Sequence, residues 1–453
     1  MHKIKSSKIL NYYSIVIIFL LAMSCSNEKE KSSNWIKTIG SNYFDECYDI
    51  AVDEDGNTYF TGVFSNELTE QHLKSNGALD IVVGKLNEYG DIEWIKNFGG
   101  KNEDEAYSII ISNCNVYVAG YFSDEIRVCG KKYVSVGVED AFLLKLSKDG
   151  DELSFQAFGS KGHDEAVTLQ LTDNKEILVG GFFEMQLIEF PQLKSNGEID
   201  AFIAKMDEYN KITAIKNYGG VGNDRVSCNK KDINGNFFFA GSMYVDSVQK
   251  EDNWILTIDE ELTLKTSFTF GSKAYDQIHS IDVFKNNIII SGEYKNGLWR
   301  IADKQLETPY YNYSDAYFAS ISKNQKLNWI KTISSPKHEW AKGLCVTEEN
   351  IYMASEFNDS AFVSFESDKF VHSKGLYDVY LAKIDDKGEV LANILIQGKS
   401  EEGINKLVIN GKHLYACGWV YDTVYFNNQK AISKGEGDVY VWKCELDKLF
   451  KKN

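Results

Sequence analysis

The feature that most constrains this chain is a segment of about sixty residues that recurs seven times. An aspartate opens an apolar run in each copy, and the runs read DIVVGKL, DAFLLKL, DAFIAKM, DNWILTI, DAYFASI, DVYLAKI and DVYVWKC. Their first residues are Asp80, Asp140, Asp200, Asp252, Asp315, Asp378 and Asp438. Self-similarity at such a period is typical of repeat architectures, in which every copy forms one structural unit. The 453 residues therefore predict one large repeat domain rather than several unrelated domains.

Each copy contains four strand-like segments. In the first copy these are residues 48–52, 58–64, 80–86 and 92–98, with the turn sequences DEDG and NEYG inside the first and the last pair. Short strands separated by such turns are typical of antiparallel hairpins. The third segment is apolar on both of its alternating faces, which favours a sheet that is covered on both sides. Four short strands repeated radially predict an all-β fold, a seven-bladed β-propeller with four-stranded antiparallel blades.

Two sequence marks recur at fixed places in the copies. One is a glycine in the second strand, as in Gly62, Gly120 and Gly241. The other is Ser-x-Gly-x-x-Asp before the third strand, at residues 75–80 in the first copy and 433–438 in the last. Over residues 34–446 these marks resemble the SBBP repeat, the bacterial seven-bladed β-propeller repeat. The resemblance implies a propeller fold and export, and it implies no single biochemical activity.

The first 24 residues differ from the rest. Lys3, Lys5 and Lys8 precede an apolar run at 12–23, which is shorter than the roughly 20 residues that cross a membrane. A basic start and a short apolar core are typical of a secretory signal. The run ends in Ala-Met-Ser-Cys, which resembles the lipobox of bacterial lipoproteins and implies lipid attachment at Cys25. We predict a lipoprotein signal peptide at 1–24; an ordinary cleaved signal and a retained anchor are the alternatives.

Residues 25–33 are polar and lack apolar anchors, which is typical of a flexible tether. An acidic stretch directly after a lipidated cysteine resembles a surface-export signal of some Gram-negative lipoproteins. The resemblance implies an outer-membrane lipoprotein at the cell surface, with a periplasm-facing orientation as the alternative. The predicted organisation is a signal peptide at 1–24, a tether at 25–33 that is joined to the membrane through lipid on Cys25, and a propeller at 34–453.

Charge and cysteine spacing limit the partners. The net charge is −17, and removing the three lysines of the signal peptide, which holds no acidic residue, makes it −20. Such a body repels phosphate backbones, so nucleic acid is excluded as a partner. The seven cysteines after Cys25 are widely spaced and form no CxxC pair, which argues against a zinc site or a dense disulfide framework. The DEDGN sequence at 53–57 lacks the full ligand set of an EF-hand and predicts a hairpin turn. We expect no metal and no cofactor.

A second acidic position recurs five residues after the glycine that follows the last strand. It is occupied by Asp45, Asp104, Asp164, Asp224, Asp276 and Glu339. In a propeller these residues would circle one mouth of the central channel, where they would hold a cation or a basic ligand. Alternatively, each carboxylate accepts backbone N–H groups where the chain enters an inner strand. We favour the structural role, because a binding site usually breaks the symmetry of a repeat.

Two functions fit these observations. The first is a binding or scaffold module at the cell envelope, with an unknown protein or glycan ligand. The second is an envelope hydrolase or lyase that acts on a glycan or peptide at the channel mouth. Fold alone does not separate them, and the lack of a catalytic motif such as HExxH or GxSxG favours binding. The fifth copy carries an unshared aromatic and basic stretch that predicts a binding surface, since Trp, Tyr and Arg dominate hot spots; its residues are Trp299, Arg300, Tyr310, Tyr311 and Tyr313.

The two ends of the repeat region complement each other. Each internal copy ends in a strand such as EWIKNFG at 93–99, and the region begins with the similar piece NWIKTIG at 34–40. The seventh copy runs through 438–444 and is followed by a tail, 447–453, that lacks this pattern. We therefore predict that residues 35–39 pair antiparallel with 439–445, which buries Trp35, completes the last blade and closes the ring. Such pairing also removes open sheet edges, which invite aggregation.

Overall fold

The computed structural model describes residues 33–451 apart from 69–70, 247–249, 273, 296–297, 302–303, 308–312 and 365–368. The predicted signal peptide, Cys25 and most of the tether lie outside the described residues. Residues 34–453 form one compact unit. No helix within the described ranges is long and apolar enough to cross a membrane. The unit is almost entirely β-structure, with one short helix, α2 (Leu446–Leu449), after the last strand.

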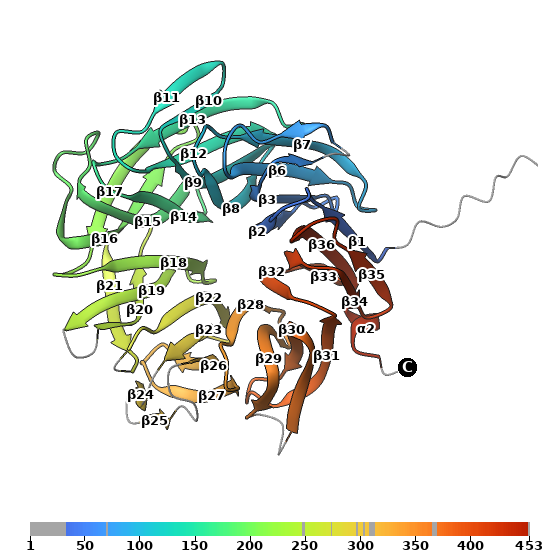
Figure 1. Cartoon of the computed structure of the whole chain (residues 1–453). Helices are drawn as coiled ribbons and strands as arrows, with labels where there is room; N and C mark the ends of the chain where they lie inside the picture. Colours follow the sequence, from blue (N-terminus) through green and yellow to red (C-terminus); the bar gives the residue numbers. More distant parts are fainter. Residues whose placement is uncertain are drawn as a thin grey trace, which may run out of the picture. The chain divides into compact units, whose positions relative to one another are not determined.

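The strands form the antiparallel blades of a β-propeller, arranged around a common centre (Figure 1). We number the strands of each blade from the centre outward. The first, inner strands are β2 (Glu46–Val52), β8 (Glu105–Ser112), β14 (Asp164–Leu171), β18 (Asp224–Lys231), β22 (Gln277–Phe284), β28 (Trp340–Val346) and β32 (Glu402–Asn410). The second strands are β3 (Thr58–Phe64), β9 (Asn115–Phe122), β15 (Ile177–Gln186), β19 (Phe237–Asp246), β23 (Asn287–Lys295), β29 (Ile351–Val363) and β33 (His413–Val420).

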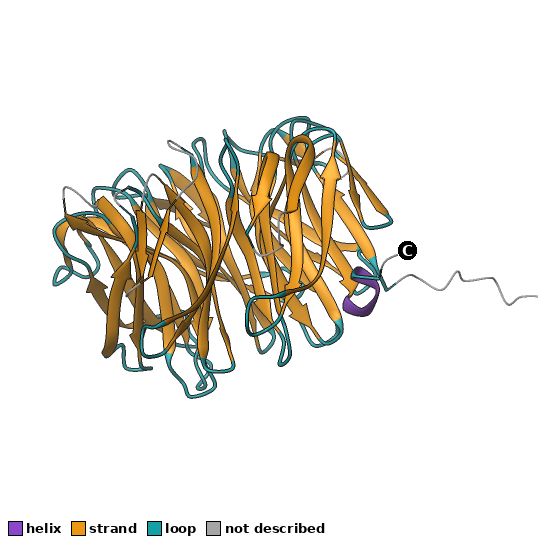
Figure 2. Cartoon of the chain, turned by 90° about the horizontal axis from the view of Figure 1, so that it is seen from below, coloured by secondary structure: helices purple, strands orange, loops and turns teal. Residues whose placement is uncertain are grey.

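The third and fourth strands complete each blade. The third strands are β6 (Asp80–Leu86), β12 (Asp140–Ser147), β16 (Lys194–Met206), β20 (Lys250–Ile258), β26 (Ser314–Ser322), β30 (Lys369–Ile384) and β36 (Asp438–Glu445). The outer strands are β7 (Ile92–Phe98), β13 (Glu152–Phe158), β17 (Ile212–Tyr218), β21 (Leu264–Phe270), β27 (Leu327–Ser334), β31 (Val390–Gly398) and, next to β36, β1 (Trp35–Ile39). Figure 2 shows the loops of the unit gathered at two opposite faces, with the strands running between them.

Small hairpins fill the connection between the second and third strands of several blades. Their strands are β4 (Glu67–Leu68) with β5 (Leu73–Lys74), β10 (Glu125–Val128) with β11 (Lys131–Val134), β24 (Leu298–Ile301) with β25 (Lys304–Glu307), and β34 (Thr423–Phe426) with β35 (Gln429–Ile432). Some of these connections reach the outer strand of the preceding blade. Thus β29 pairs with β27, and β34 pairs with β31.

The strand predicted to complete the last copy lies beside it. β1 pairs antiparallel with β36, in a register from Trp35↔Lys443 to Ile39↔Val439. The Trp35 side chain is only 7% exposed, and its indole N–H donates a 2.9 Å hydrogen bond to the carbonyl of Glu88. Inner strands also contact each other across the two ends of the chain, since β32 contacts β2. The Asn405 side-chain amide on β32 donates to Glu46 Oε1 at 2.7 Å and to the Cys47 carbonyl at 2.9 Å.

The recurring glycine of the second strand has a steric cause. The inner strand β2 carries a bulge between Cys47 and Asp49, so that its backbone bends toward β3. A Cβ at Gly62 of β3 would overlap the carbonyl oxygen of Glu46. The same overlap, with the carbonyl of Glu105, would occur at Gly120 of the next blade. Glycine therefore recurs because only a residue without a side chain allows this close approach.

Apolar clusters fill the spaces between neighbouring blades. One cluster joins Tyr59 and Val83 of the first copy to Val118 and Leu144 of the second. All seven cysteines after Cys25 are free, as their spacing predicts, and four of them are buried: Cys47, Cys345, Cys417 and Cys444. The DEDGN segment forms the predicted hairpin turn, closed by the Gly56 N–H on the Asp53 carbonyl at 3.0 Å, with Gly56 at φ +81°.

Candidate functional site

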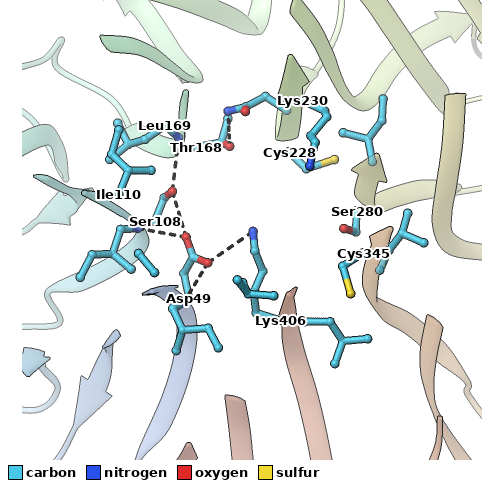
Figure 3. A pocket seen from close by; sticks show the side chains of 18 of the residues that line it. Asp49, Ser108, Ile110, Thr168, Leu169, Cys228, Lys230, Ser280, Cys345 and Lys406 are labelled. Carbon is cyan, nitrogen blue, oxygen red and sulfur yellow. Dashed lines mark hydrogen bonds and ion pairs between the residues drawn. The ribbon is translucent and has the colours of Figure 1, made fainter. Parts of the chain in front are cut away.

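A central channel runs between the inner strands, and a cavity of about 510 Å³ occupies its middle (Figure 3). Asp49 of β2 lies at 3.3 Å from the Lys406 ammonium of β32. The same carboxylate accepts hydrogen bonds from the Ser108 hydroxyl at 3.1 Å and from the Ile109 N–H at 3.0 Å. The polar groups on this side of the channel therefore form ion pairs and hydrogen bonds with one another, and these bonds connect three neighbouring blades.

The opposite side of the channel is built in the same way. Lys230 pairs with Asp282 at 2.9 Å, and the Asn229 amide donates to the Thr168 hydroxyl at 2.6 Å. Cys228 and Cys345 also line this cavity, and burial raises the pKa of the Cys228 thiol to about 12. A thiol that stays protonated is a poor nucleophile. We therefore interpret the middle of the channel as a structural polar network rather than a reaction centre.

One mouth of the channel breaks the symmetry of the repeat. Two further cavities, of about 370 and 450 Å³, open there and share His279 and Lys342; we call these the mouth cavities. At this mouth the equivalent position of the inner strands is a glutamate in the first three copies, Glu46, Glu105 and Glu165, and differs in the other four, where it is Arg225, Gln277, Trp340 and Gly403. Unshared side chains at a repeated position are what a binding site in a repeat protein requires.

Glu105 is the centre of an acid–tyrosine cluster in this mouth. Its carboxylate accepts hydrogen bonds from the hydroxyls of Tyr48 at 3.0 Å and Tyr121 at 2.9 Å, and Tyr107 adds a third. The tyrosine rings form a continuous wall, with centroids 5.5 Å apart for Tyr48–Tyr107 and 5.9 Å for Tyr107–Tyr121. Burial raises the pKa of Glu105, opposed by these hydroxyls. Burial together with the charges of neighbouring glutamates raises the pKa of Glu165 to about 8.

Two basic side chains near the mouth each form an ion pair with a glutamate. Lys342 lies 3.4 Å from Glu356, and Arg225 lies 3.8 Å from Glu251. Glu356 belongs to the second strand of its blade and lines a mouth cavity, and Glu251 belongs to the third strand of its blade. No group of three acidic, histidine or cysteine side chains in the described part of the chain converges closely enough to hold a metal ion.

A second aromatic group lies on the other side of the mouth. Trp340 and Trp419 both line a mouth cavity. The Trp340 ring stacks on His338, with centroids 5.9 Å apart, and packs on Tyr377 at 5.2 Å. Tyr313, one of the binding residues predicted in the fifth copy, packs edge-on against His338 at 5.3 Å. Tyr313 is therefore connected to the mouth through one intervening ring.

The six residues of the predicted acidic ring lie directly behind the mouth. Asp45, Asp104, Asp164, Asp224, Asp276 and Glu339 are buried, and none of them lines the three channel cavities. Asp104 shows the shared arrangement, since its carboxylate accepts the backbone N–H groups of Gly100 at 2.6 Å and Ser123 at 3.0 Å. The residues after three of them, Glu46, Glu105 and Trp340, line the mouth cavities instead. Successive side chains of a strand point to opposite faces, so the residue next to each buried carboxylate could have been predicted to face the channel.

Each buried carboxylate of this series also lies near a second one. Asp104 faces Asp80, the aspartate that opens the third strand of the preceding copy, across Gly99. A Cβ at Gly99 would overlap the Asp80 carboxyl group, which explains why a glycine ends the outer strand. Burial raises the pKa of Asp104 to about 7, and the charge of Asp80 adds to the effect. These pairs are therefore sites where two acids share limited space between blades.

The structure does not present Trp299 as part of a binding surface, contrary to the sequence prediction. Its side chain is 1% exposed and packs against Phe270 of the preceding blade at 5.4 Å and against Tyr317 of its own at 5.2 Å. The β24–β25 hairpin turns this ring inward, where it fills the gap between two blades. Arg300 is exposed. Tyr310 and Tyr311 lie outside the described residues.

Replacing Trp299 with Ala will therefore lower the stability of the protein. We expect a loss of about 3–5 kcal/mol in the free energy of unfolding, which is typical of a buried Trp replaced by Ala. Chemical denaturation followed by circular dichroism measures it. Arg300→Ala is the matched control, because its side chain is exposed and such changes stay within about 0.5 kcal/mol. Equal stability of the two variants would show that Trp299 does not join the blades.

No family of protein sequences matches the chain, and no curated protein matches it either. Its structural neighbours are β-propeller proteins. The WD40 domain of Pan2 from Neurospora crassa is 10% identical over 90% of this chain and 91% of that one, with a TM-score of 0.49. BamB from Moraxella catarrhalis is 10% identical over 90% and 98%, with a TM-score of 0.40. The β-propeller domain of the Trilobed protease from Pyrococcus furiosus is 9% identical over 90% and 97%, with a TM-score of 0.44.

Proposed function

We propose that the chain is a lipid-anchored, seven-bladed SBBP-type propeller that is closed by its N-terminal strand and binds a ligand at one channel mouth. The seven sequence copies, the β1–β36 pairing and the contacts of neighbouring inner strands support the ring. The ligand-binding role rests on one observation. At the mouth, one equivalent position carries Glu in three copies and Arg, Gln, Trp or Gly in the other four, whereas the polar groups deeper in the channel pair with one another.

A binding screen tests this role. The mature full-length protein in detergent micelles is screened against glycan and peptide arrays, and every hit is measured again with two variants. Trp340→Ala removes an aromatic side chain from the mouth, and Tyr209→Ala removes one that is 80% exposed elsewhere. We expect Trp340→Ala to weaken binding at least about tenfold, as loss of an aromatic hot spot does, and Tyr209→Ala to have no effect. Hits that bind both variants like the wild type would place the site elsewhere.

The envelope location is the second part of the proposal. Its support is the basic start, the short apolar run and the cysteine at the end of that run. A single acyl chain binds membranes only weakly, but the several chains of a lipoprotein anchor hold a protein stably. We expect Cys25→Ala to move the protein from the membrane fraction to the soluble fraction, as immunoblotting of fractionated cells would show. Unchanged membrane association of this variant would contradict the lipid anchor.

A hydrolase or lyase remains the second candidate, and one observation favours it. Glu165 has a pKa of about 8 beside the tyrosine wall, and a carboxyl group protonated near neutral pH is suited to general acid catalysis. The screen separates the two functions. Release of a cleaved product from a bound hit, abolished by Glu165→Gln, would support the enzyme.

A further inference from the structure

We propose that the channel mouth binds an organic cation, namely a primary ammonium or guanidinium group such as those of lysine and arginine side chains. The inference rests on the proposed binding function and names the chemistry of the ligand. The two mouth cavities are lined by five carboxylates, those of Glu46, Glu105, Glu293, Glu356 and Glu401, and by two basic side chains, Lys342 and His279.

The carboxylates are only partly compensated inside the protein. Lys342 lies 3.4 Å from Glu356, and its charge also acts on Glu46. Glu105 has only neutral hydroxyl donors as hydrogen-bond partners, from Tyr48, Tyr107 and Tyr121. A half-buried carboxylate without a counter-charge is costly, and a bound cation offsets that cost. The mouth thus offers negative charge to a ligand, and an anionic ligand would be repelled.

The aromatic side chains of the mouth select the kind of cation. Tyr48 and Tyr107 line one mouth cavity, and Trp340 and Trp419 line the other. Ammonium and guanidinium groups are attracted to the faces of aromatic rings, and guanidinium groups also stack on them. The carboxylates, in contrast, do not converge in threes on a point where a metal ion would sit. Dispersed acids and ring faces suit an extended organic cation better than a metal ion.

His279 supplies an independent observation. It lines both mouth cavities, and its Nε2 atom is buried without a hydrogen-bond partner. The nearest acceptor, Glu293 Oε1, lies 3.6 Å away, which is beyond hydrogen-bonding distance. A ligand polar group that reaches His279 Nε2 would give a hydrogen-bond partner to an atom that the protein leaves without one.

The test uses the mature full-length protein in micelles at physiological ionic strength, where general attraction to the acidic body is screened. The probe is a fluorescent tetra-arginine peptide, with tetra-glutamate as the negative peptide and spermidine as a competitor. Glu46→Gln/Glu105→Gln removes two mouth charges and keeps side-chain size. Glu54→Gln/Glu208→Gln removes two charges from exposed positions outside the mouth. Thermal melting verifies that both variants are folded.

We expect tetra-arginine to bind, the mouth variant to weaken binding at least about tenfold, and the surface variant to change it less than about twofold. If spermidine displaces tetra-arginine, the ligand is a small amine. If spermidine does not displace it, the ligand is a peptide that carries basic side chains. Equal weakening by both variants, or binding of tetra-glutamate, would overturn the proposal. If neither cation binds while a hit of the array screen depends on Trp340, the cation inference fails and the proposed binding function stands.

Discussion

Deleting residues 26–40 will lower the free energy of unfolding by at least about 5 kcal/mol, whereas deleting the tether residues 26–33 will change it by less than about 0.5 kcal/mol. The longer deletion removes β1, and with it a ladder of five residue pairs to β36. It also removes the buried side chains of Trp35 and Ile39. Loss of a buried Trp side chain alone typically costs about 3–5 kcal/mol, and the lost ladder adds to this.

The deletion also changes the surface that β36 presents. Without β1, the third strand of the last blade becomes an open edge, which invites pairing between molecules. We therefore expect the longer deletion to aggregate on partial unfolding, as light scattering during a thermal scan would detect. Trp35→Ala keeps the backbone ladder and separates the two contributions. Because Trp35 bonds to the Glu88 carbonyl and packs on Gly90 of the first copy, this variant should still lose about 3 kcal/mol.

Equal denaturation midpoints for the two deletions would contradict this account of β1. Such a result would mean that the last blade is stable with three strands and that the ring does not need its N-terminal strand. The matched pair is informative because both variants retain Cys25 and the same signal sequence. Their difference is confined to residues 34–40.

The sequence predicted the outer three strands of a copy better than the inner one. The expected segments 58–64, 80–86 and 92–98 coincide with β3, β6 and β7. The first was expected at 48–52, whereas β2 begins at Glu46. β3 and β6 are buried at every residue, so their apolar pattern is easily recognised. The inner strand has one face on the channel, and polar residues such as Glu46 there hide its beginning.

The predicted acidic series lies one residue before the residues that line the candidate site. The acidic series was recognised because it recurs in every copy, and it recurs because Asp104 and its equivalents bind backbone N–H groups. The next residue is Glu in only the first three copies and differs in the other four, so its repeat signal is weaker than that of the buried acids. Trp299 illustrates the opposite error, because an unshared aromatic residue was interpreted as a surface although it fills a gap between blades. A single sequence does not separate unshared residues that face a ligand from those that face the core.

Raising the pH from 5.5 to 8.5 will lower the melting temperature of the wild-type protein by at least about 5 °C. The cause is the set of buried carboxylate pairs between blades. Burial raises the pKa of Asp45, Asp104 and Asp164 to about 7, and that of Glu339 to about 8. Glu402 is the extreme case, because burial and the neighbouring Asp378 carboxyl group raise its pKa to about 10.

The direction follows from proton uptake. In the unfolded chain these groups lose their protons near their ordinary pKa values of about 4, whereas in the folded protein they keep them up to about 7 or above. Between these limits the folded state binds more protons than the unfolded state, so stability falls as the pH rises. The stabilisation is fully present below about pH 4 and is lost as the pH passes through the raised values. Asp53 and Glu293, whose pKa values are lowered, act in the opposite direction only at more acidic pH.

Glu402→Gln separates this specific effect from general charge repulsion. Glutamine imitates the protonated side chain, because its amide donates to Asp378 without taking up a proton. We expect the variant to melt close to the wild type at pH 5.5 and above it at pH 8.5, so that its melting temperature falls less steeply with pH. Differential scanning calorimetry at a series of pH values measures both slopes. A variant that follows the wild-type curve throughout would show that Glu402 is ionised in the folded protein, and that the paired acids between the blades do not share protons.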